Sequence, residues 1–204
     1  MNNKKINVSV RHDIVNKATD AQKLLLGSGW KDVEITVDDL IEHIKKGFAY
    51  THKFIDGHRT RENFLNADVL IADIDDGLTL EQAVDDPFIK QYATFIHTTP
   101  NHKPERHRFR IIFVLDKRMF SADAYEAMYR TLMDIIPTDP AVKSCAQPFF
   151  GFDKTRIITI GKSLREAKIQ EMINQEMTRC HRQSNPEIVQ EIAATTTVKI
   201  ADCA

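Results

Sequence analysis

Two aspartates at the end of an apolar run are the residues of this chain best placed to do chemistry. Asp73 and Asp75 interrupt the apolar stretch from Val69 to Ile74, and their spacing of two puts both carboxylates on one face of a strand. Buried neighbouring carboxylates repel each other, so a divalent cation between them is the simplest stabiliser, and oxygen ligands favour Mg²⁺ or Mn²⁺ over Zn²⁺. The alternative is that Asp75-Asp76-Gly77 only forms a turn and that Asp73 is a capping or paired acid.

The elements that must position these aspartates follow a βαββαβ order. We expect strands at residues 68–75, 93–98 and 108–115, with further strand candidates at 149–152 and 157–160. Thr79 and Gln82 form a capping-box pattern for one helix, and Ser121 caps a second helix that ends before Pro137. This order predicts an α+β fold with an RRM-like or ferredoxin-like unit over residues 68–160.

A small α/β unit is expected at residues 30–67, in front of that sheet. Its predicted elements are a strand at 33–37, a helix opened by the Thr36–Asp39 capping box and a strand at 48–55. Residues 14–25 have helical periodicity before the Gly27-Ser28-Gly29 break. Together, residues 1–160 are predicted to form one catalytic core, and 161–204 a C-terminal helix and a weakly ordered tail.

The order of the strands brings distant polar residues to one edge of the predicted sheet. In an antiparallel sheet of this order, the ends of the first two strands and the starts of the next two share an edge. Asp73 and Asp75 end the first strand, His102 lies between the second and third strands, and Asp139 precedes the fourth. We therefore expect these four side chains to converge.

Basic residues gather in two stretches, although the formal net charge is −1. One runs from 102 to 118, where Arg108 and Arg110 begin the third strand and are expected to point toward the aspartates. The other runs from 45 to 61 and includes Lys53, Arg59 and Arg61. A divided surface of this kind can hold polyanions beside a metal site; the alternative is that both stretches are solvated faces.

Composition places few limits on function. No long apolar run, signal peptide or lipidation motif is present, so a cytoplasmic protein without a membrane partner is expected. The three cysteines have no C-x-x-C spacing, which favours reduced thiols over a zinc site. The chain has no P-loop motif, and we therefore expect no helicase of its own.

The ordered motifs resemble those of the archaeo-eukaryotic primase superfamily, in particular the small primase-polymerases of plasmids, phages and other mobile elements. The resemblance covers roughly residues 48–160, and its motifs are Asp73-Ile-Asp75, Thr98 to His102, Arg108-Phe-Arg110 and Thr138-Asp139. The chain departs from the family pattern at Pro100, which occupies the usual serine position, and at Gln147, where an arginine would be expected.

The resemblance implies a catalytic core of the archaeo-eukaryotic primase (AEP) type and a two-metal site for Mg²⁺ or Mn²⁺. The implied metal ligands are Asp73, Asp75 and Asp139. The implied nucleotide-binding residues are His102, Arg108 and Arg110. The basic residues expected to contact template or nucleotide are Lys53, Arg59 and Arg61.

These features predict a DNA primase or polymerase that makes or extends primers in the replication of a mobile element. Its partners would be a single-stranded DNA template and nucleoside triphosphates, with a separate helicase or initiator protein as a further candidate. A metal-dependent nuclease could use the same carboxylates to activate water. A catalytically degenerate RRM-like module could instead bind single strands, although such modules rely on aromatic residues on the sheet face, where this chain has aspartates and arginines.

Overall fold

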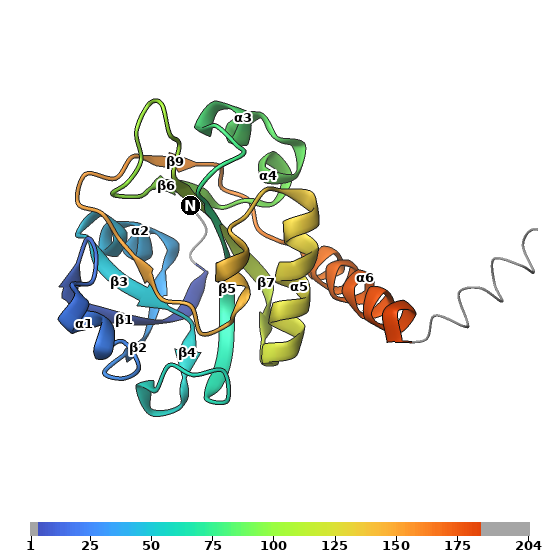
Figure 1. The fold of residues 1–204 in the computed structure, drawn as a ribbon, viewed down its shortest axis with the longest axis horizontal. Helices are drawn as coiled ribbons and strands as arrows, with labels where there is room; N and C mark the ends of the chain where they lie inside the picture. The colour runs from blue at the N-terminus through green and yellow to red at the C-terminus, as the bar shows by residue number, and fades with distance from the viewer. Residues whose placement is uncertain (1–3, 185–204) are drawn as a thin grey trace, which may run out of the picture.

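Two antiparallel sheets form the centre of the protein. The computed structural model describes residues 4–184. The first sheet has the order β2 (Lys31–Thr36), β1 (Lys5–Val15), β3 (Phe48–Thr51) and β8 (Phe149–Phe150). The second has the order β4 (Lys53–Phe54), β5 (Phe64–Ile74), β7 (Phe109–Met119), β6 (Phe95–Thr98) and β9 (Ile157–Thr159). Figure 1 shows the two sheets side by side, and buried residues of both belong to one continuous hydrophobic core.

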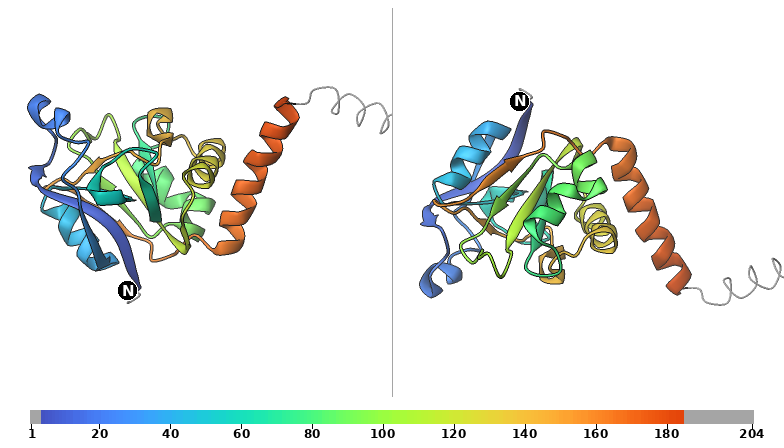
Figure 2. Two further views of the ribbon diagram at one scale, coloured as in Figure 1. Left: turned by 90° about the horizontal axis from the view of Figure 1, so that it is seen from below. Right: turned by 90° about the horizontal axis from the view of Figure 1, so that it is seen from above.

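Helices cover the sheets on their outer sides. α1 (Asp20–Leu24) and α2 (Val37–Lys45) belong to the first sheet, and α3 (Leu80–Asp85), α4 (Pro87–Tyr92) and α5 (Ala122–Ile135) to the second. Short 3-10 helices lie at Ile55–Gly57 and Pro140–Lys143. α6 (Glu166–Ser184) packs on α5 and extends away from the sheets, as Figure 2 shows. Among residues 4–184, no helix is long and apolar enough to cross a membrane.

The central strands β5 and β7 are buried on both faces. They pair in continuous register from Val69 opposite Val114 to Ile74 opposite Phe109. Because both faces are covered, β7 reads as an almost unbroken apolar run, and every residue from Phe109 to Leu115 is buried. The charged exception in that run is Arg110, which therefore needs a buried partner.

The sequence signals for the helix starts are confirmed. Thr36 with Asp39 and Thr79 with Gln82 each form a complete capping box, and the Ser121 side chain accepts a hydrogen bond from the backbone of Ala124. Each hydroxyl accepts from a backbone N–H that would otherwise have no partner, and so fixes where its helix begins.

The predicted helix at residues 14–25 is wrong for most of its length. Ile6, Val8 and Val10 alternate inward along the eleven-residue strand β1, which continues to Val15. Asn16 then adopts a positive φ of 61°, which no helix tolerates, and α1 contains only five residues after its Thr19 cap.

The α+β fold is confirmed, but the last strand lies at the other edge of the second sheet. In a ferredoxin-like sheet the fourth strand would lie beside the first. Here β4 is joined to β5 by a short connection and occupies that edge, so β9 pairs with β6 instead. The two sheets also do not coincide with the two predicted units. β4, from the predicted 30–67 unit, belongs to the second sheet, and β8, from the predicted 68–160 unit, belongs to the first. The predicted tail from residue 185 onward lies outside the described residues.

Asp68, in the middle of β5, joins the two sheets. Its buried carboxylate accepts hydrogen bonds from the Asn7 backbone and side chain on β1 and two from Arg118 on β7. Burial alone would raise the pKa of Asp68, but the hydrogen bonds from Arg118 and Asn7 outweigh that effect, and the pKa lies below its usual value.

We expect Arg118→Ala to lower the free energy of unfolding by about 2 kcal/mol at neutral pH, because it removes two hydrogen bonds from a buried charge. Since the lowered pKa of Asp68 stabilises the fold only while the carboxylate is ionised, the difference should shrink below about pH 4. Urea unfolding at several pH values measures both effects. Lys117→Ala, which breaks an exposed pair with Glu166, is the control and should change stability by less than about 1 kcal/mol. Equal effects of the two variants would contradict the role given to Asp68.

Candidate active site

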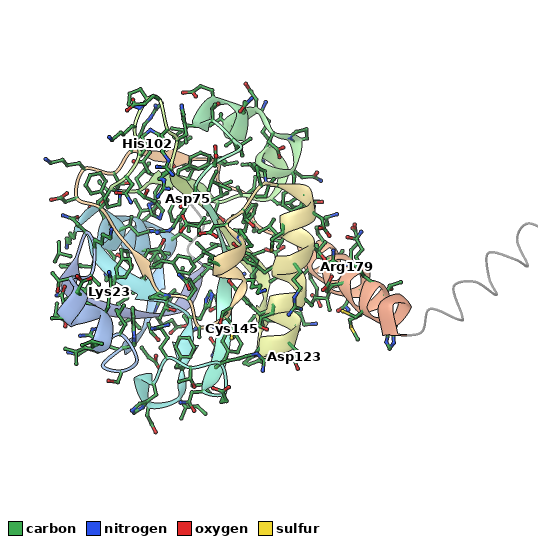
Figure 3. The ribbon with its side chains drawn as sticks, in the orientation of Figure 1. Lys23, Asp75, His102, Asp123, Cys145 and Arg179 are labelled. Atoms are coloured by element: carbon green, nitrogen blue, oxygen red, sulfur yellow. The ribbon has the colours of Figure 1, made fainter. Side chains whose placement is uncertain are left out.

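A cleft of about 340 Å³ opens between the two sheets at the carboxyl end of β5. The second sheet and its loops contribute Asp73, Asp75, Thr99, Pro100, Asn101, Arg108 and Arg110. The first sheet and its connections contribute Asn16, Lys17, Ala18, Lys23, Leu26, Pro148 and Phe150. Figure 3 labels Asp75 and Lys23, which approach this region from the two halves of the protein. Acidic, basic and apolar side chains therefore meet in one cavity.

Asp73 and Arg110 form the buried pair at the base of the cleft. They face each other across β5 and β7, and an Arg110 Nη2–H donates to Asp73 Oδ2 at 3.3 Å. Arg110 Nε and Asp73 Oδ1 are 3.2 Å apart but are not aligned for a hydrogen bond, which leaves Oδ1 buried without a donor. Arg110 also donates to the Phe150 carbonyl at 2.7 Å, so the guanidinium links both sheets.

Two buried side chains, His97 and Tyr50, lie next to Arg110. His97 lies opposite Arg110 on β6, and its Nε2 is 2.8 Å from the Tyr50 hydroxyl on β3. Burial, reinforced by the positive charge of Arg110, lowers the pKa of His97 to about 3, so the ring is neutral. Its Nδ1–H donates to the Thr98 carbonyl, and Nε2 therefore accepts from Tyr50. The neutral ring adds no positive charge to the base of the cleft.

Asp75 lies nearer to solvent and pairs with Arg108 at 3.2 Å. Partial burial raises the pKa of Asp75, and the negative charges of Asp73 and Asp139 raise it further against the opposing effect of Arg108. Burial and the two neighbouring carboxylates thus disfavour the ionised form of Asp75, and a divalent cation bound nearby would favour it.

His102 lies in the loop between β6 and β7, above Asp75 in Figure 3. Its Nδ1 accepts a hydrogen bond from the Arg108 backbone at 3.1 Å, so the neutral ring carries its proton on Nε2. Partial burial and the neighbouring His107 lower the pKa of His102. His102 does not line the cleft, and its observed contact holds the backbone of Arg108, the residue directly before β7.

Asp139 meets Asp73 through the backbone. Its N–H donates to the Asp73 carbonyl at 2.8 Å, as the predicted convergence of the strand ends requires. Its Oδ1 accepts from Ala141 and caps the 3-10 helix at Pro140–Lys143, so this oxygen is already engaged. Asp139 lies close enough to influence the pKa of Asp75 but does not line the cleft.

The carboxylates of Asp73 and Asp75 fit a hard divalent cation. Asp73 offers a buried oxygen without a donor, and Asp75 is a partly buried carboxylate with two acidic neighbours, Asp73 and Asp139. Within residues 4–184, no group of three or more His, Cys, Asp or Glu could hold a metal ion by itself. Mg²⁺ is often held by one or two carboxylates together with substrate phosphates, and two aspartates are sufficient for that arrangement.

Comparison with known proteins identifies the family of the chain. Residues 46–149, about half of the chain, match the family model of the VapE N-terminal domain. The chain belongs to this family. No curated protein matches it. Among solved structures, the chain is similar to the AEP domain of the cyanophage S-2L primase-polymerase, with 9% identity, coverage of 84% of this chain and 90% of that one, and a TM-score of 0.49.

The basic residues expected to contact the template make other contacts in this structure. Lys53 pairs with Asp32 at 3.5 Å, and Arg61 pairs with Asp123 and Glu126. Arg59 is partly buried and donates to the backbone carbonyls of Leu26 and Ala146. None of the three lines the cleft, and their contact with a template stays a prediction.

Sequence patterns did not identify the residues that the first sheet contributes to the cleft. Asn16, Lys17 and Lys23 fell within the wrongly predicted helix, so nothing placed them near Asp73. His97 offered a weak signal, as a polar residue within an otherwise apolar strand.

We expect Asp73→Asn to lower the pKa of Asp75 and Arg108→Met to raise it, because these changes remove a negative and a positive neighbour respectively. Titration of the Asp75 side-chain carboxyl by carbon-13 NMR measures both shifts. Asp38→Asn, a change of an exposed acid on α2, is the matched control and should leave the pKa where it is. An Asp75 titration that is the same in wild type and Asp73→Asn would show that the two carboxylates do not interact.

Proposed function

We propose that this chain is a metal-dependent nucleotidyltransferase that makes or extends primers on single-stranded DNA during replication of a plasmid, phage or other mobile element. The observation that carries the proposal is the cleft in which two adjacent carboxylates lie beside four cationic side chains, namely Lys17, Lys23, Arg108 and Arg110. Carboxylates for divalent cations and cations for phosphates are the groups that phosphoryl transfer requires.

Asp73 and Asp75 would hold Mg²⁺ or Mn²⁺, with Asp139 as a further candidate ligand through its remaining oxygen. Such ions lower the pKa of an attacking hydroxyl and neutralise the charge of the triphosphate. Arg110 holds the Asp73 carboxylate in place, since both are largely buried in one ion pair. We therefore treat Arg110 as a positioning residue.

Arg108 is the arginine better placed to bind phosphate. Its side chain lines the cleft and is less buried than that of Arg110, and its Nε lacks a hydrogen-bond partner among the described residues. A planar guanidinium can bind phosphate through two parallel hydrogen bonds. His102 would add an Nε2–H donor if its loop moved toward the nucleotide.

The apolar part of the cleft could receive the sugar or base. Leu26, Pro148 and Phe150 line it, and the Phe150 backbone is fixed by the hydrogen bond from Arg110. Ring and aliphatic surfaces accept any base, which suits an enzyme whose choice of nucleotide comes from pairing with the template.

Incorporation of labelled nucleotides on a primed single-stranded template tests the activity. We expect wild type to extend the primer with Mg²⁺ or Mn²⁺, and Asp73→Asn or Asp75→Asn to lower the rate by more than about 100-fold. Mutation of a residue that only hydrogen-bonds to a metal ligand already lowers metal affinity or activity about 10- to 100-fold. Asp76→Asn is the matched control and should retain activity, because Asp76 is exposed and its Oδ1 accepts only from the adjacent Gly77 N–H. No extension by wild type with either metal would refute the proposal.

Arg108→Ala should weaken binding of a nucleoside triphosphate by about 1.5 to 3 kcal/mol, the range for hydrogen bonds to charged groups. Isothermal titration calorimetry with Mg²⁺ present measures the change. Arg106→Ala is the control, since Arg106 is an exposed arginine in the preceding loop and does not line the cleft. Unchanged affinity in Arg108→Ala would remove this residue from the nucleotide site.

A second candidate is a catalytically degenerate module that binds single-stranded DNA. The observation that favours it is that Asp73 and Asp75 each already pair with an arginine. The same assay separates the two candidates when single-strand binding is measured alongside extension. Binding without extension, unaffected by Asp73→Asn, would support the degenerate module.

A further inference from the structure

The cleft contains a cation without an acidic partner. Arg108 and Arg110 pair with the two cleft aspartates, and Lys23 pairs with Asp20 at 2.7 Å. Lys17 forms no ion pair among the described residues; the pKa of nearby Asp20 is lowered mainly by the hydrogen bond from Lys23, and the charge of Lys17 is a minor cause. The excess positive charge of the cleft is therefore contributed by the first sheet, on the side opposite the aspartates.

A tight turn fixes the backbone that carries Lys17. Asn16 has a φ of 61°, its N–H donates to the Gly47 carbonyl at 2.7 Å, and the Lys17 N–H donates to the Val15 carbonyl at 2.7 Å. The Asn16 side-chain Oδ1 accepts from the Asp153 N–H at 2.9 Å. The turn is thus bonded to two other segments of the chain, although Lys17 itself is exposed.

Gly47 allows these segments to approach so closely. It has a φ of 78°, and a Cβ at this position would lie 2.4 Å from Asn16 Oδ1 and 2.9 Å from a Val15 methyl group. Any side chain would therefore displace the turn, as well as strain the backbone. The place of Lys17 at the cleft depends on this close contact.

We propose that Lys17 binds the triphosphate of the incoming nucleotide from the first sheet, opposite Arg108, and that Asn16 is its positioning residue. This inference rests on the proposed nucleotidyltransferase function. An ammonium group acts on phosphate as a compact point charge, and a cation without a carboxylate partner is the group most free to do so. Two sheets would then hold the phosphate chain from opposite sides, while the aspartates hold the metal.

Equilibrium binding of a nucleoside triphosphate and of its monophosphate, measured on the full chain with Mg²⁺, tests the inference. Lys17→Ala should weaken triphosphate binding about 10-fold and monophosphate binding less than about 3-fold, because the lost contact lies on the outer phosphates. Lys17→Arg should recover part of the affinity. Lys5→Ala is the control, since Lys5 is an exposed lysine at the first position of β1, the strand that ends two residues before Lys17.

Primer extension separates a positioning role from a general structural one. Lys17→Ala should raise the KM for nucleotide about 10-fold with kcat within about 3-fold of wild type. Asn16→Gly keeps the left-handed backbone at little cost but removes the bond to Asp153, and should raise KM less than Lys17→Ala, with an unchanged thermal midpoint as the check on folding.

The outcomes distinguish the inference from the proposed function. If wild type binds triphosphates and extends primers while Lys17→Ala matches it in triphosphate affinity and KM, the inference is wrong and the function stands. Equal losses of triphosphate and monophosphate binding would also overturn it. If wild type binds no triphosphate, both the inference about Lys17 and the proposed function are wrong.

Discussion

The ion pair between Asp73 and Arg110 is the interaction on which the cleft depends. Both side chains are largely buried, and a buried charge without its partner is strongly destabilising. The register of β5 and β7 places them opposite each other, so the pair forms wherever these two strands pair correctly. Since Arg110 also donates to the Phe150 carbonyl, the same guanidinium sets the distance between the two sheets at the cleft.

Charged groups join the two sheets at two places along β5. In the middle of the strand, the Asp68 carboxylate accepts hydrogen bonds from Arg118 of its own sheet and from Asn7 of the other. Near the carboxyl end, Arg110 of β7 donates to Asp73 of its own sheet and to the Phe150 carbonyl of the other. The rest of the contact between the sheets is a continuous apolar core, and apolar contacts by themselves do little to fix the relative orientation of the sheets. Hydrogen bonds to buried charges are directional, and they therefore fix how the sheets face each other and what the cleft contains.

Sequence patterns predicted part of the cleft on the second sheet: Asp73, Asp75, Arg108 and Arg110 line it, whereas His102 and Asp139 do not. The Asp73-Ile-Asp75 spacing, the strand at 108–115 and the order of the elements were sufficient to bring Asp73 and the Asp139 backbone together, because antiparallel strands leave few choices. The position of β9 was not predictable from alternation, since β4 competes for the same edge and its two residues give no separate signal. Nor could charge alone show that Arg59 is held by backbone carbonyls.

The half contributed by the first sheet depends on a backbone conformation that composition hardly reveals. Asn16 is a residue that tolerates positive φ, but the same segment also fits a helical period, and the period was the stronger signal. Only the close contact with Gly47 decides between them, and it joins residues 31 positions apart in sequence.

The pairing of both carboxylates with arginines has a consequence for how ligands would bind. A divalent cation at Asp73 and Asp75 would compete with Arg110 and Arg108 for the same two carboxylates, so binding of metal alone would gain little. A triphosphate offers Arg108 another anionic partner and brings further oxygens to the metal, and each ligand then favours the other. Arg110 has no such freedom, because Phe150 and Tyr50 enclose it. The outer arginine would therefore exchange partners while the buried one holds Asp73 in place, which couples metal binding to the arrival of the nucleotide.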